Sequence, residues 1–416
     1  MNRKMRIAVL SLGHPEFSAG GAETASYNLF KGYQETDDVE HAFYLARIDR
    51  GQRPTGGITW YRGNEFFWEQ AMHDWTFLRG LAREPAATSM AEWLDYARPD
   101  IVHAHHYAHM GLETFRLIRN QLPNAKIFLT LHEYMAICLH NGQMIKRHNG
   151  NLCREASLEA CGKCYPEHSR ETLWMRKSFI QNHFEVIDGF IAPSEFLRQR
   201  YIAWGIAPEK ITVIENAQVD HGLVEPRPIG EGEQRNRFGY FGQVNRYKGV
   251  DILLQAFEQA TRSKEPLIYL EVHGANLEHQ PADFRERVDR LRTKLERRGV
   301  LQWMGAYEPE DLPRRMSNVD WVVMPSIWWE NSPMIIQEAF SCGRPVICSG
   351  IGGMAEKVRH GGDGFHVEPG NIIGWVRMLT NAGSTCAIWE RARSSISPPP
   401  TTSTAVAAHM KAFAKL

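Results

Sequence analysis

Short apolar runs rich in valine and isoleucine alternate with longer amphipathic stretches along the whole chain. Such runs are typical of buried parallel strands, and the amphipathic stretches are typical of the helices that connect them. The pattern therefore predicts an α/β protein. In the first half, the expected strands are residues 6–12, 42–48, 101–104, 126–131, 189–192 and 211–214, and the clearest helices are 22–33, 111–121, 172–186 and 194–203.

A polar segment rich in glycine and proline, residues 221–237, interrupts this pattern before it begins again. The strands expected after it are residues 238–242, 267–273, 301–304, 321–324, 345–348 and 364–367. We predict two tandem Rossmann-like, doubly wound domains, residues 1–217 and 218–395, followed by a tail, 396–416, with one more short helix. Such sheets bind ligands beyond the carboxyl ends of their strands, so two of them facing each other would bind a ligand across a cleft.

The composition and the net charge of the chain exclude some classes of function. The 416 residues include 48 Lys+Arg and 48 Asp+Glu, so no net charge draws the protein to nucleic acid. No run approaches the roughly 20 apolar residues that a spanning helix needs. The apolar run near the amino terminus, residues 7–12, is too short for a secretory signal. We expect a cytoplasmic protein that is not a nucleic-acid binder.

The segment WVVMPSIWWENSPMIIQEAF, residues 321–340, carries the most informative pattern. It predicts a strand, a loop through Glu330, and a helix that starts near Pro333 with Ser332 as its N-cap. Free amides at such a helix start form an anion site. Glu330 and Glu338 could accept hydrogen bonds from the vicinal hydroxyls of a ribose or a sugar. The alternative is that both glutamates are solvated.

Two further loops each follow a strand and precede a helix. In YFGQVNRYKGVDILLQAF, residues 240–257, Arg246 and Lys248 suit a diphosphate, although the run is not a P-loop and an ordinary basic loop is the alternative. In SAGGAET, residues 18–24, Gly20 and Gly21 open a helix where the backbone can approach a ligand closely. The absence of GxGxxG there argues against a nicotinamide cofactor.

Taken together, these runs resemble the retaining GT-B glycosyltransferases that use nucleotide-sugar donors, of the family 4-like, group 1 type. The specific element is the Glu-x7-Glu signature, Glu330 and Glu338. The resemblance implies that Glu338 holds the nucleotide ribose, that Glu330 lies by the donor sugar, and that the amides of Met334 and Ile335 meet the phosphates. It also places Asn331 and Ser332 in the donor site.

The resemblance extends to the glycines, the basic pair and a histidine. The family's Gly-Arg-x4-Lys-Gly run begins here with Gly242-Gln243 and ends with Lys248-Gly249. Lys248 is retained, and Arg246 is close enough to stand in for the missing arginine. Gly20 and Gly21 match the glycine loop that faces donor and acceptor. His132 matches the active-site histidine that contacts the donor sugar, whereas a lone histidine at a strand end is more often structural.

Histidines and cysteines cluster in the first half. The run DIVHAHHYAH, residues 100–109, ends a strand, and His105 and His106 could hydrogen-bond an acceptor. A metal among these histidines is the less favoured interpretation. In a cysteine-rich insertion, about 135–168, four cysteines could bind structural zinc, although the first pair lacks the usual zinc spacing. Otherwise they are reduced thiols or form a disulfide after oxidation. They are Cys138, Cys153, Cys161 and Cys164.

Two biased segments allow more than one role. The aromatic residues between 60 and 93 are most simply core residues, although such rings can also stack on sugars or sit at a bilayer interface. The arginine-dense stretch 283–299 is most simply a solvated helix face, with attachment to an anionic membrane as the alternative.

The sequence thus predicts a glycosyltransferase with an amino-terminal acceptor domain and a carboxyl-terminal donor domain. By the resemblance, a sugar passes from a nucleotide diphosphate to a hydroxyl of a glycan or lipid-linked acceptor with retention of configuration, and no metal or cofactor is needed. Cell-surface polysaccharide synthesis, at the inner face of the membrane, is the implied context, and the tail helix is expected to pack on the first domain. The alternatives are an epimerase or hydrolase of nucleotide sugars and a non-catalytic glycan- or nucleotide-binding protein.

Overall fold

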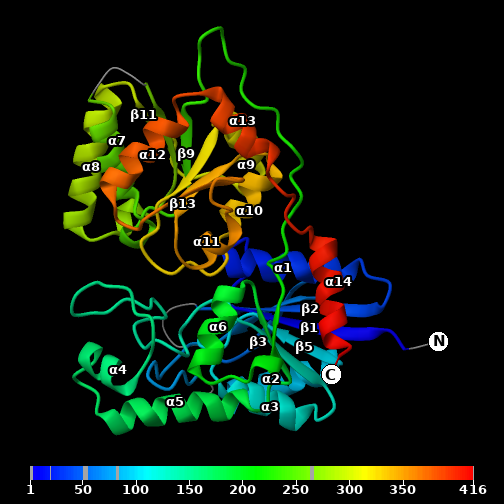
Figure 1. Ribbon diagram of the computed structural model, residues 1–416. Helices are drawn as coiled ribbons and strands as arrows, with labels where there is room; N and C mark the ends of the chain where they lie inside the picture. The colour runs from blue at the N-terminus through cyan, green and yellow to red at the C-terminus, as the bar shows by residue number, and fades with distance from the viewer. Residues whose placement is uncertain (1–2, 19, 50–54, 81–83, 263–266, 416) are drawn as a thin grey trace. The chain divides into compact units, whose positions relative to one another are not determined.

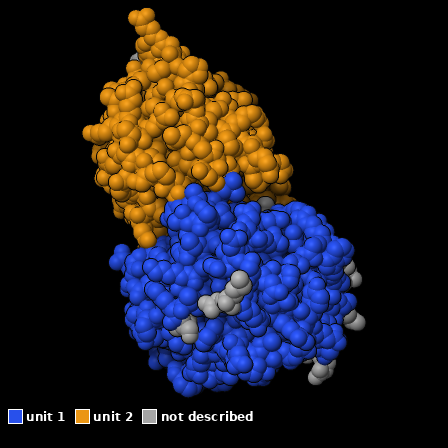
Figure 2. Space-filling view, turned by 90° about the vertical axis from the view of Figure 1, so that its right-hand side faces the viewer, with its two compact units in different colours: residues 1–219, 400–416 blue, residues 220–399 orange. Residues whose placement is uncertain are grey.

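The computed structural model describes residues 3–18, 20–49, 55–80, 84–262 and 267–415 (Figure 1). Its residues form two compact units, coloured separately in Figure 2. Unit 1 comprises residues 1–219 together with 400–416, and unit 2 comprises residues 220–399. None of the described helices is both long enough and apolar enough to cross a membrane.

Unit 1 is built on an eight-stranded sheet of order β3-β4-β2-β1-β5-β6-β7-β8. All neighbouring pairs are parallel except β3 and β4, which form an antiparallel pair at one edge. The strands are β1 (Met5–Ser11), β2 (Val39–Ile48), β3 (Ile58–Arg62), β4 (Glu65–Glu69), β5 (Ile101–Ala104), β6 (Lys126–Thr130), β7 (Gly189–Ala192) and β8 (Ile211–Val213). The α-helices are α1 (Gly21–Gln34), α2 (Glu84–Ala97), α3 (Glu113–Gln121), α4 (Leu158–Cys164), α5 (Arg170–Phe184), α6 (Glu195–Trp204) and α14 (Thr402–Phe413).

The last helix of the chain, α14, packs against α1 in unit 1 (Figure 1). Val406 and Phe413 of α14 share an apolar cluster with Phe30 and Tyr33 of α1. Gly32 allows this close approach, because a Cβ atom there would lie 2.5 Å from Val406 Cγ2. The tail therefore belongs to the same compact unit as the first half of the chain.

Unit 2 is built on a parallel six-stranded sheet of order β11-β10-β9-β12-β13-β14. Its strands are β9 (Arg237–Phe241), β10 (Tyr269–His273), β11 (Leu301–Trp303), β12 (Trp321–Met324), β13 (Val346–Ser349) and β14 (Gly364–Val367). Its α-helices are α7 (Val250–Ala260), α8 (Ala282–Arg297), α9 (Leu312–Ser317), α10 (Met334–Ser341), α11 (Gly352–Lys357), α12 (Ile372–Ala382) and α13 (Cys386–Ser394). The short 3-10 turn η2 (Arg246–Lys248) precedes α7.

The aromatic segment that shows no period in the sequence contains β3 and β4. Phe66 and Trp68 of β4 are buried, and so is Trp93 of α2. Trp60 and Trp75 are exposed. The core interpretation therefore holds for part of this aromatic set only.

Candidate functional site

The order of strands in unit 2 brings two loops together at the carboxyl edge of the sheet. The first strand of unit 2, β9, lies between β10 and β12 in the sheet. The chain adds β10 and β11 on one side of β9 and then adds β12, β13 and β14 on its other side, so the strand order reverses at the boundary between β9 and β12. In open α/β sheets such a switch point is where ligands bind. The loop after β9 carries Arg246 and Lys248, and the loop after β12 carries Glu330.

These two loops are fixed to each other by the main chain. The Ile327 amide donates a hydrogen bond to the Tyr247 carbonyl oxygen at 2.8 Å. Gly249 has a φ of +69° and passes so close to the other loop that a Cβ atom there would lie 2.2 Å from the Pro325 carbonyl oxygen. Only glycine fits both the left-handed backbone and this contact.

Lys248 and Glu330 form an ion pair between the two loops. Lys248 Nζ donates to Glu330 Oε1 at 2.7 Å, and the two side chains are only 24% and 10% exposed. The same oxygen accepts hydrogen bonds from Ser326 Oγ at 2.9 Å and from Trp328 Nε1 at 2.7 Å. The structure thus brings together two residues that the sequence predicted for one site, and it adds Ser326 and Trp328, which the sequence did not indicate.

The backbone of Glu330 is also held by the first turn of α11, the helix after β13. The Gly353 amide donates to the Glu330 carbonyl oxygen at 2.7 Å. A Cβ atom at Gly353 would lie 1.7 Å from the Asn331 carbonyl oxygen, so a larger residue would displace the Glu330 loop. Both the main chain and the carboxylate of Glu330 are therefore fixed.

The helix that follows, α10, starts one residue later than the sequence suggested. Met334 and Ile335 form its first two positions, and Pro333, with an extended ψ of 118°, is the N-cap. The prediction that Ser332 caps the helix is wrong, because Ser332 precedes the capping position and no side chain caps α10. Within the described chain, Ser332 Oγ is buried without a hydrogen-bond partner.

Glu338 lies on α10 and is partly buried. Its carboxylate makes no hydrogen bond or ion pair with the residues that the structure describes. It interacts electrostatically with Tyr307, where burial and the negative charge of Glu338 both raise the pKa of the phenol. Burial raises the pKa of Glu338 to about 7. A carboxylate held this way, without a partner of its own, is suited to accept hydrogen bonds from a ligand.

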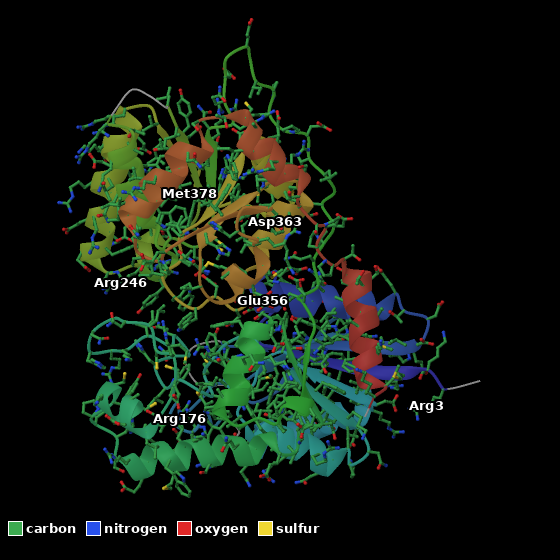
Figure 3. The ribbon with its side chains drawn as sticks, viewed as in Figure 1. Arg3, Arg176, Arg246, Glu356, Asp363 and Met378 are labelled. Carbon is green, nitrogen blue, oxygen red and sulfur yellow. The ribbon has the colours of Figure 1, made fainter. Side chains whose placement is uncertain are left out.

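Arg246 stands at the start of the η2 turn, and its side chain is exposed (Figure 3). The Asn245 side chain fixes this turn by accepting from the amides of Tyr247 and Lys248, both at 3.0 Å. Gln243, at the position where the family pattern has arginine, is also exposed. Arg246 is therefore an exposed arginine on this loop that could bind an anion in place of the family's arginine.

In unit 1, Gly20 is the N-cap of α1 and Gly21 is its first residue. A Cβ atom at Gly20 would lie 2.3 Å from Glu23 Oε2, so the glycine leaves room for the Glu23 side chain to fold back toward the helix start. Burial raises the pKa of Glu23. The glycine loop thus lies after β1, the strand on which the sheet of unit 1 reverses its order.

His132 follows β6 and bonds to a histidine that follows β5. The distance between His105 Nδ1 and His132 Nε2 is 3.0 Å, and the two rings are stacked at 5.2 Å with an interplanar angle of 23°. Burial lowers the pKa of His132 to about 4 and that of His105 well below its usual range. Both rings are therefore neutral at pH 7.

The two histidines predicted to bind an acceptor have partners within unit 1, and their role toward an acceptor stays a prediction. His105 and His106 are buried, at 1% and 4% exposure. His106 bonds through Nε2 to His109 Nδ1 at 2.6 Å, and His105 bonds to His132. Each of the two rings is therefore held by a hydrogen bond to another histidine.

Two more histidines, which the sequence analysis did not select, extend this group. His103 Nε2 lies 2.7 Å from Thr130 Oγ1, and His103 Nδ1 lies 3.1 Å from the Tyr33 hydroxyl. The His103 ring lies 5.2 Å from that of His409 on α14. The apolar pattern alone offered no signal for His409, because only the family resemblance indicated which unit the tail helix joins.

The four clustered cysteines line a cavity of about 420 Å³ together with Arg176. The structure has all four as thiols, and a disulfide formed after oxidation stays a prediction. Burial and the neighbouring thiols raise the pKa of Cys161 to about 11. Among the described residues, however, no three Cys, His, Asp or Glu side chains are grouped so that they could hold a metal ion. The zinc site therefore remains a prediction without support from the geometry.

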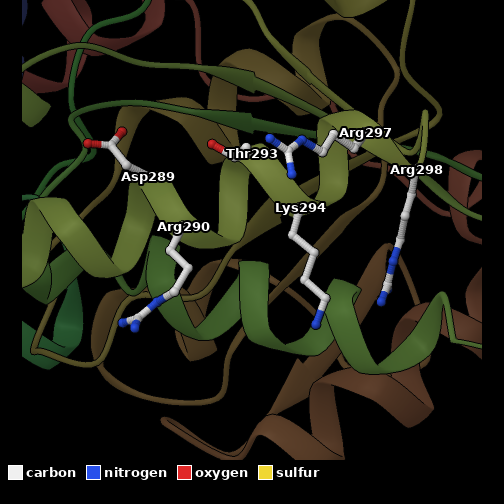
Figure 4. Close-up of a pocket in the computed structure, with 6 residues that line it drawn as sticks. All are labelled: Asp289, Arg290, Thr293, Lys294, Arg297 and Arg298. Carbon is white, nitrogen blue, oxygen red and sulfur yellow. The ribbon is translucent and has the colours of Figure 1, made fainter.

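The arginine-dense helix α8 forms the wall of a shallow hollow on unit 2 (Figure 4). Lys294 and Arg298 reach Glu258 of α7, at 2.8 Å and 3.4 Å. Arg262 also pairs with Glu258, at 3.0 Å. Part of the basic face thus holds α8 to α7 and is not free for a membrane. The residues that line the hollow are Asp289, Arg290, Thr293, Lys294, Arg297 and Arg298.

Comparison with known proteins agrees with this geometry. A family model described as Glycosyltransferase Family 4 matches residues 19–218, and one described as Glycosyl transferases group 1 matches residues 224–382. Among curated proteins, the uncharacterized glycosyltransferase MJ1607 of Methanocaldococcus jannaschii is 27% identical over 46% of this chain and 46% of its own length. A D-inositol 3-phosphate glycosyltransferase of Jonesia denitrificans is 28% identical over 34% of this chain and 33% of its own length. The matched part is thus less than half of each of these relatives.

Solved structures share the whole fold at low sequence identity. HepE of Anabaena, in complex with UDP and glucose, has a TM-score of 0.65 at 18% identity and covers 99% of this chain and 100% of its own. The lipopolysaccharide outer core galactosyltransferase WaaB, in its apo form, has a TM-score of 0.65 at 19% identity with the same coverage. With matching family models on both halves and the GT-B fold throughout, the chain belongs to the group 1, family 4-like glycosyltransferases.

Proposed function

We propose that this protein transfers a sugar from a nucleotide diphosphate sugar to a hydroxyl group of a glycan or lipid-linked acceptor, with retention of the anomeric configuration. The observation that carries the proposal is the Lys248–Glu330 ion pair at the switch point of unit 2. Nearby in sequence on α10, the Glu338 carboxylate has no hydrogen-bond or ion-pair partner among the described residues. Unit 2 would bind the donor and unit 1 the acceptor. Cell-surface polysaccharide synthesis at the inner face of the membrane is the proposed context.

Each site residue then has a chemical role. Glu338 would accept hydrogen bonds from the ribose hydroxyls, and Glu330 would accept one from the donor sugar. Lys248, Arg246 and the first amides of α10 would stabilise the charge on the departing diphosphate. Gly20 and Gly21 would let the main chain of α1 approach the donor, and neutral His132 would contact its sugar.

The reaction breaks the bond between the anomeric carbon and the phosphate oxygen and forms a bond from that carbon to the acceptor oxygen. The acceptor proton passes to the leaving phosphate on the same face of the sugar. The protein contributes positioning and electrostatic stabilisation, and Lys248 supplies positive charge next to the leaving group. We therefore expect transfer without a catalytic metal ion. A zinc ion at the four thiols would brace the insertion and take no part in the reaction.

The test is nucleotide diphosphate release from a panel of UDP-, GDP-, ADP- and TDP-sugars, measured by mass spectrometry. Because HepE was solved with UDP, UDP-sugars are the first donors to try. Slow release from one donor, lost in Glu338→Ala and unchanged by chelator, would support metal-independent transfer. Stereochemistry of the product, read by NMR, would decide between retention and inversion.

Two other results would redirect the proposal. Rapid conversion of the donor to an epimer or to free sugar, independent of any acceptor, would indicate an epimerase or hydrolase. Nucleotide binding without turnover of any donor, even with glycan acceptors present, would indicate a binding protein. Release that stops on addition of chelator and recovers with a divalent cation would contradict metal independence.

A further inference from the structure

The carboxylate of Glu330 uses one of its two oxygens for all its contacts. Oε1 accepts hydrogen bonds from Lys248 Nζ, Ser326 Oγ and Trp328 Nε1. Three donors saturate the lone pairs of that oxygen. Oε2 has no partner in the part of the chain that the structure describes. It is thus the oxygen left to accept a hydrogen bond from a ligand.

Trp328 makes three contacts that together define its position. Its indole nitrogen donates to Glu330 at 2.7 Å. Its ring stacks on Tyr247 at 5.4 Å with an interplanar angle of 15°, and Lys248 Nζ lies 5.7 Å from the ring centroid. One side chain therefore touches the carboxylate, the lysine and the turn that carries the lysine.

We propose that Trp328, helped by Ser326, is a positioning residue that holds the Glu330 carboxylate in place while Lys248 shifts its interaction to the donor diphosphate. This inference rests on the proposed glycosyltransferase function. In this structure Lys248 neutralises Glu330. When a diphosphate binds, the lysine is drawn to the phosphate charge, and a buried carboxylate with the lysine as its sole donor would then be left without a hydrogen bond.

The two uncharged donors prevent that loss. Trp328 and Ser326 keep two hydrogen bonds on Oε1 after Lys248 moves, so Oε2 remains directed at the same point. The stack on Tyr247 and the main-chain bond from Ile327 to Tyr247 keep the indole aligned as the lysine moves. Among side chains, only tryptophan combines a flat stacking ring of this size with a single N–H donor at its edge.

The test compares Trp328→Phe and Ser326→Ala with the wild-type enzyme, using the donor that the release assay identifies. Trp328→Phe keeps a stacking ring and removes the donor. We expect kcat to fall about tenfold in Trp328→Phe, as for loss of one hydrogen bond that counts in the transition state, and less in Ser326→Ala. Calorimetric affinity for the nucleotide diphosphate should change by less than about twofold, because that ligand lacks the sugar.

A double-mutant cycle separates positioning from a general structural effect. In a Glu330→Gln background, Trp328→Phe should change kcat by less than about twofold, because the carboxylate it holds is gone. Trp303→Phe, on the β11 strand of the same unit, is the matched control and should leave kcat and nucleotide affinity as in the wild type.

Two outcomes would overturn the inference. One is an unchanged kcat in Trp328→Phe. The other is the same fold-loss in both backgrounds, with a lower melting temperature and weaker nucleotide binding, which would make Trp328 merely structural. A wild-type protein that turns over no donor would instead remove the proposed function, and this inference would fall with it.

Discussion

His105 and His132 share a hydrogen bond of 3.0 Å between rings that follow neighbouring strands, β5 and β6. One ring must donate and the other accept, so the accepting imidazole must be neutral. Burial favours the neutral form of both rings, since it lowers the pKa of His132 to about 4 and that of His105 well below its usual range. The sheet therefore presents His132 as a neutral, oriented ring.

The histidine group should make unit 1 sensitive to acid. Burial also lowers the pKa of His409 to about 4, against an ordinary value of 6.5. Between these two values the unfolded chain binds more protons than the folded one, so stability is full above pH 6.5 and falls as the pH drops toward 4. We predict that His409→Gln flattens this fall, measured as the melting temperature from pH 7 to pH 4.5.

His41→Gln is the control for the histidine prediction, because His41 is about half exposed. The melting temperature of His41→Gln should fall between pH 7 and pH 4.5 as steeply as that of the wild type. An equal fall of the melting temperature in the wild type and in His409→Gln would show that His409 does not contribute to the acid sensitivity.

Glu338→Gln should weaken nucleotide diphosphate binding and stabilise the free protein. The loss of a carboxylate acceptor for two ribose hydroxyls should cost about 1 to 3 kcal/mol of binding, measured by calorimetry. Because burial raises the pKa of Glu338 to about 7 from 4.5, the folded state binds more protons than the unfolded chain between these pH values, so its stability falls as the pH rises from 4.5 to 7 and stays lower above 7. The variant should thus melt higher than the wild type at pH 8, with the difference vanishing below pH 4.5.

The exposed Glu286 on α8 provides the comparison for Glu338. Glu286→Gln should alter neither nucleotide affinity nor the pH dependence of melting. Unchanged affinity in Glu338→Gln would remove Glu338 from the nucleotide site, whatever its effect on stability.

Lys248→Ala should reduce turnover more than donor affinity. Negative charge on the bridging phosphate oxygen grows as the sugar leaves, so the lysine contributes more in the transition state than in the ground state. The measurement is kcat for donor release set beside the calorimetric Kd for the intact donor. Arg246→Ala, which removes an exposed cation without a fixed partner in the described part of the chain, should have the smaller effect on kcat. An equal fold-loss in kcat and in affinity would contradict a transition-state role for Lys248.

The strands were predictable wherever burial on both faces produced a continuous apolar run. The predicted strands 101–104 and 321–324 coincide with β5 and β12. The edge hairpin of β3 and β4 was missed, because its aromatic residues follow no clear period. The Gly63-Asn64 pair between these strands, with Gly63 at a φ of +49°, was the available signal, since such two-residue turns close hairpins.

The site was predictable where a loop follows a strand, and not where side chains meet within a loop. Lys248 and Glu330 could be assigned to one edge because both follow strands of one parallel sheet. The bonds of Trp328 and Ser326 to Glu330 depend on the irregular path of residues 325–330, which has no period to read. The misplaced cap at Ser332 has the same origin, since the extended Pro333 delays the helix by one residue.

The ion-pair group around Glu258 should stabilise unit 2 in a pH-dependent way. Hydrogen bonds from Lys294 and Arg262 hold the pKa of Glu258 down to about 2, from an ordinary 4.5. This stabilisation is fully present above pH 4.5 and is lost as the pH falls toward 2. We predict that Glu258→Gln destabilises the protein at pH 7 by about 1 to 2 kcal/mol, a value reduced for the solvent that screens the half-exposed cations. Urea unfolding at pH 7 and pH 3 measures this loss of stability, and the difference from the wild type should be smaller at pH 3.

Glu296→Gln is the control for Glu258→Gln. It removes a single surface pair with Arg292 on α8 and should cost less than about 0.5 kcal/mol. Equal losses in the two variants would show that Glu258 contributes no more than an ordinary surface ion pair, and that α8 is held to α7 by its apolar residues Phe284, Val288 and Leu295.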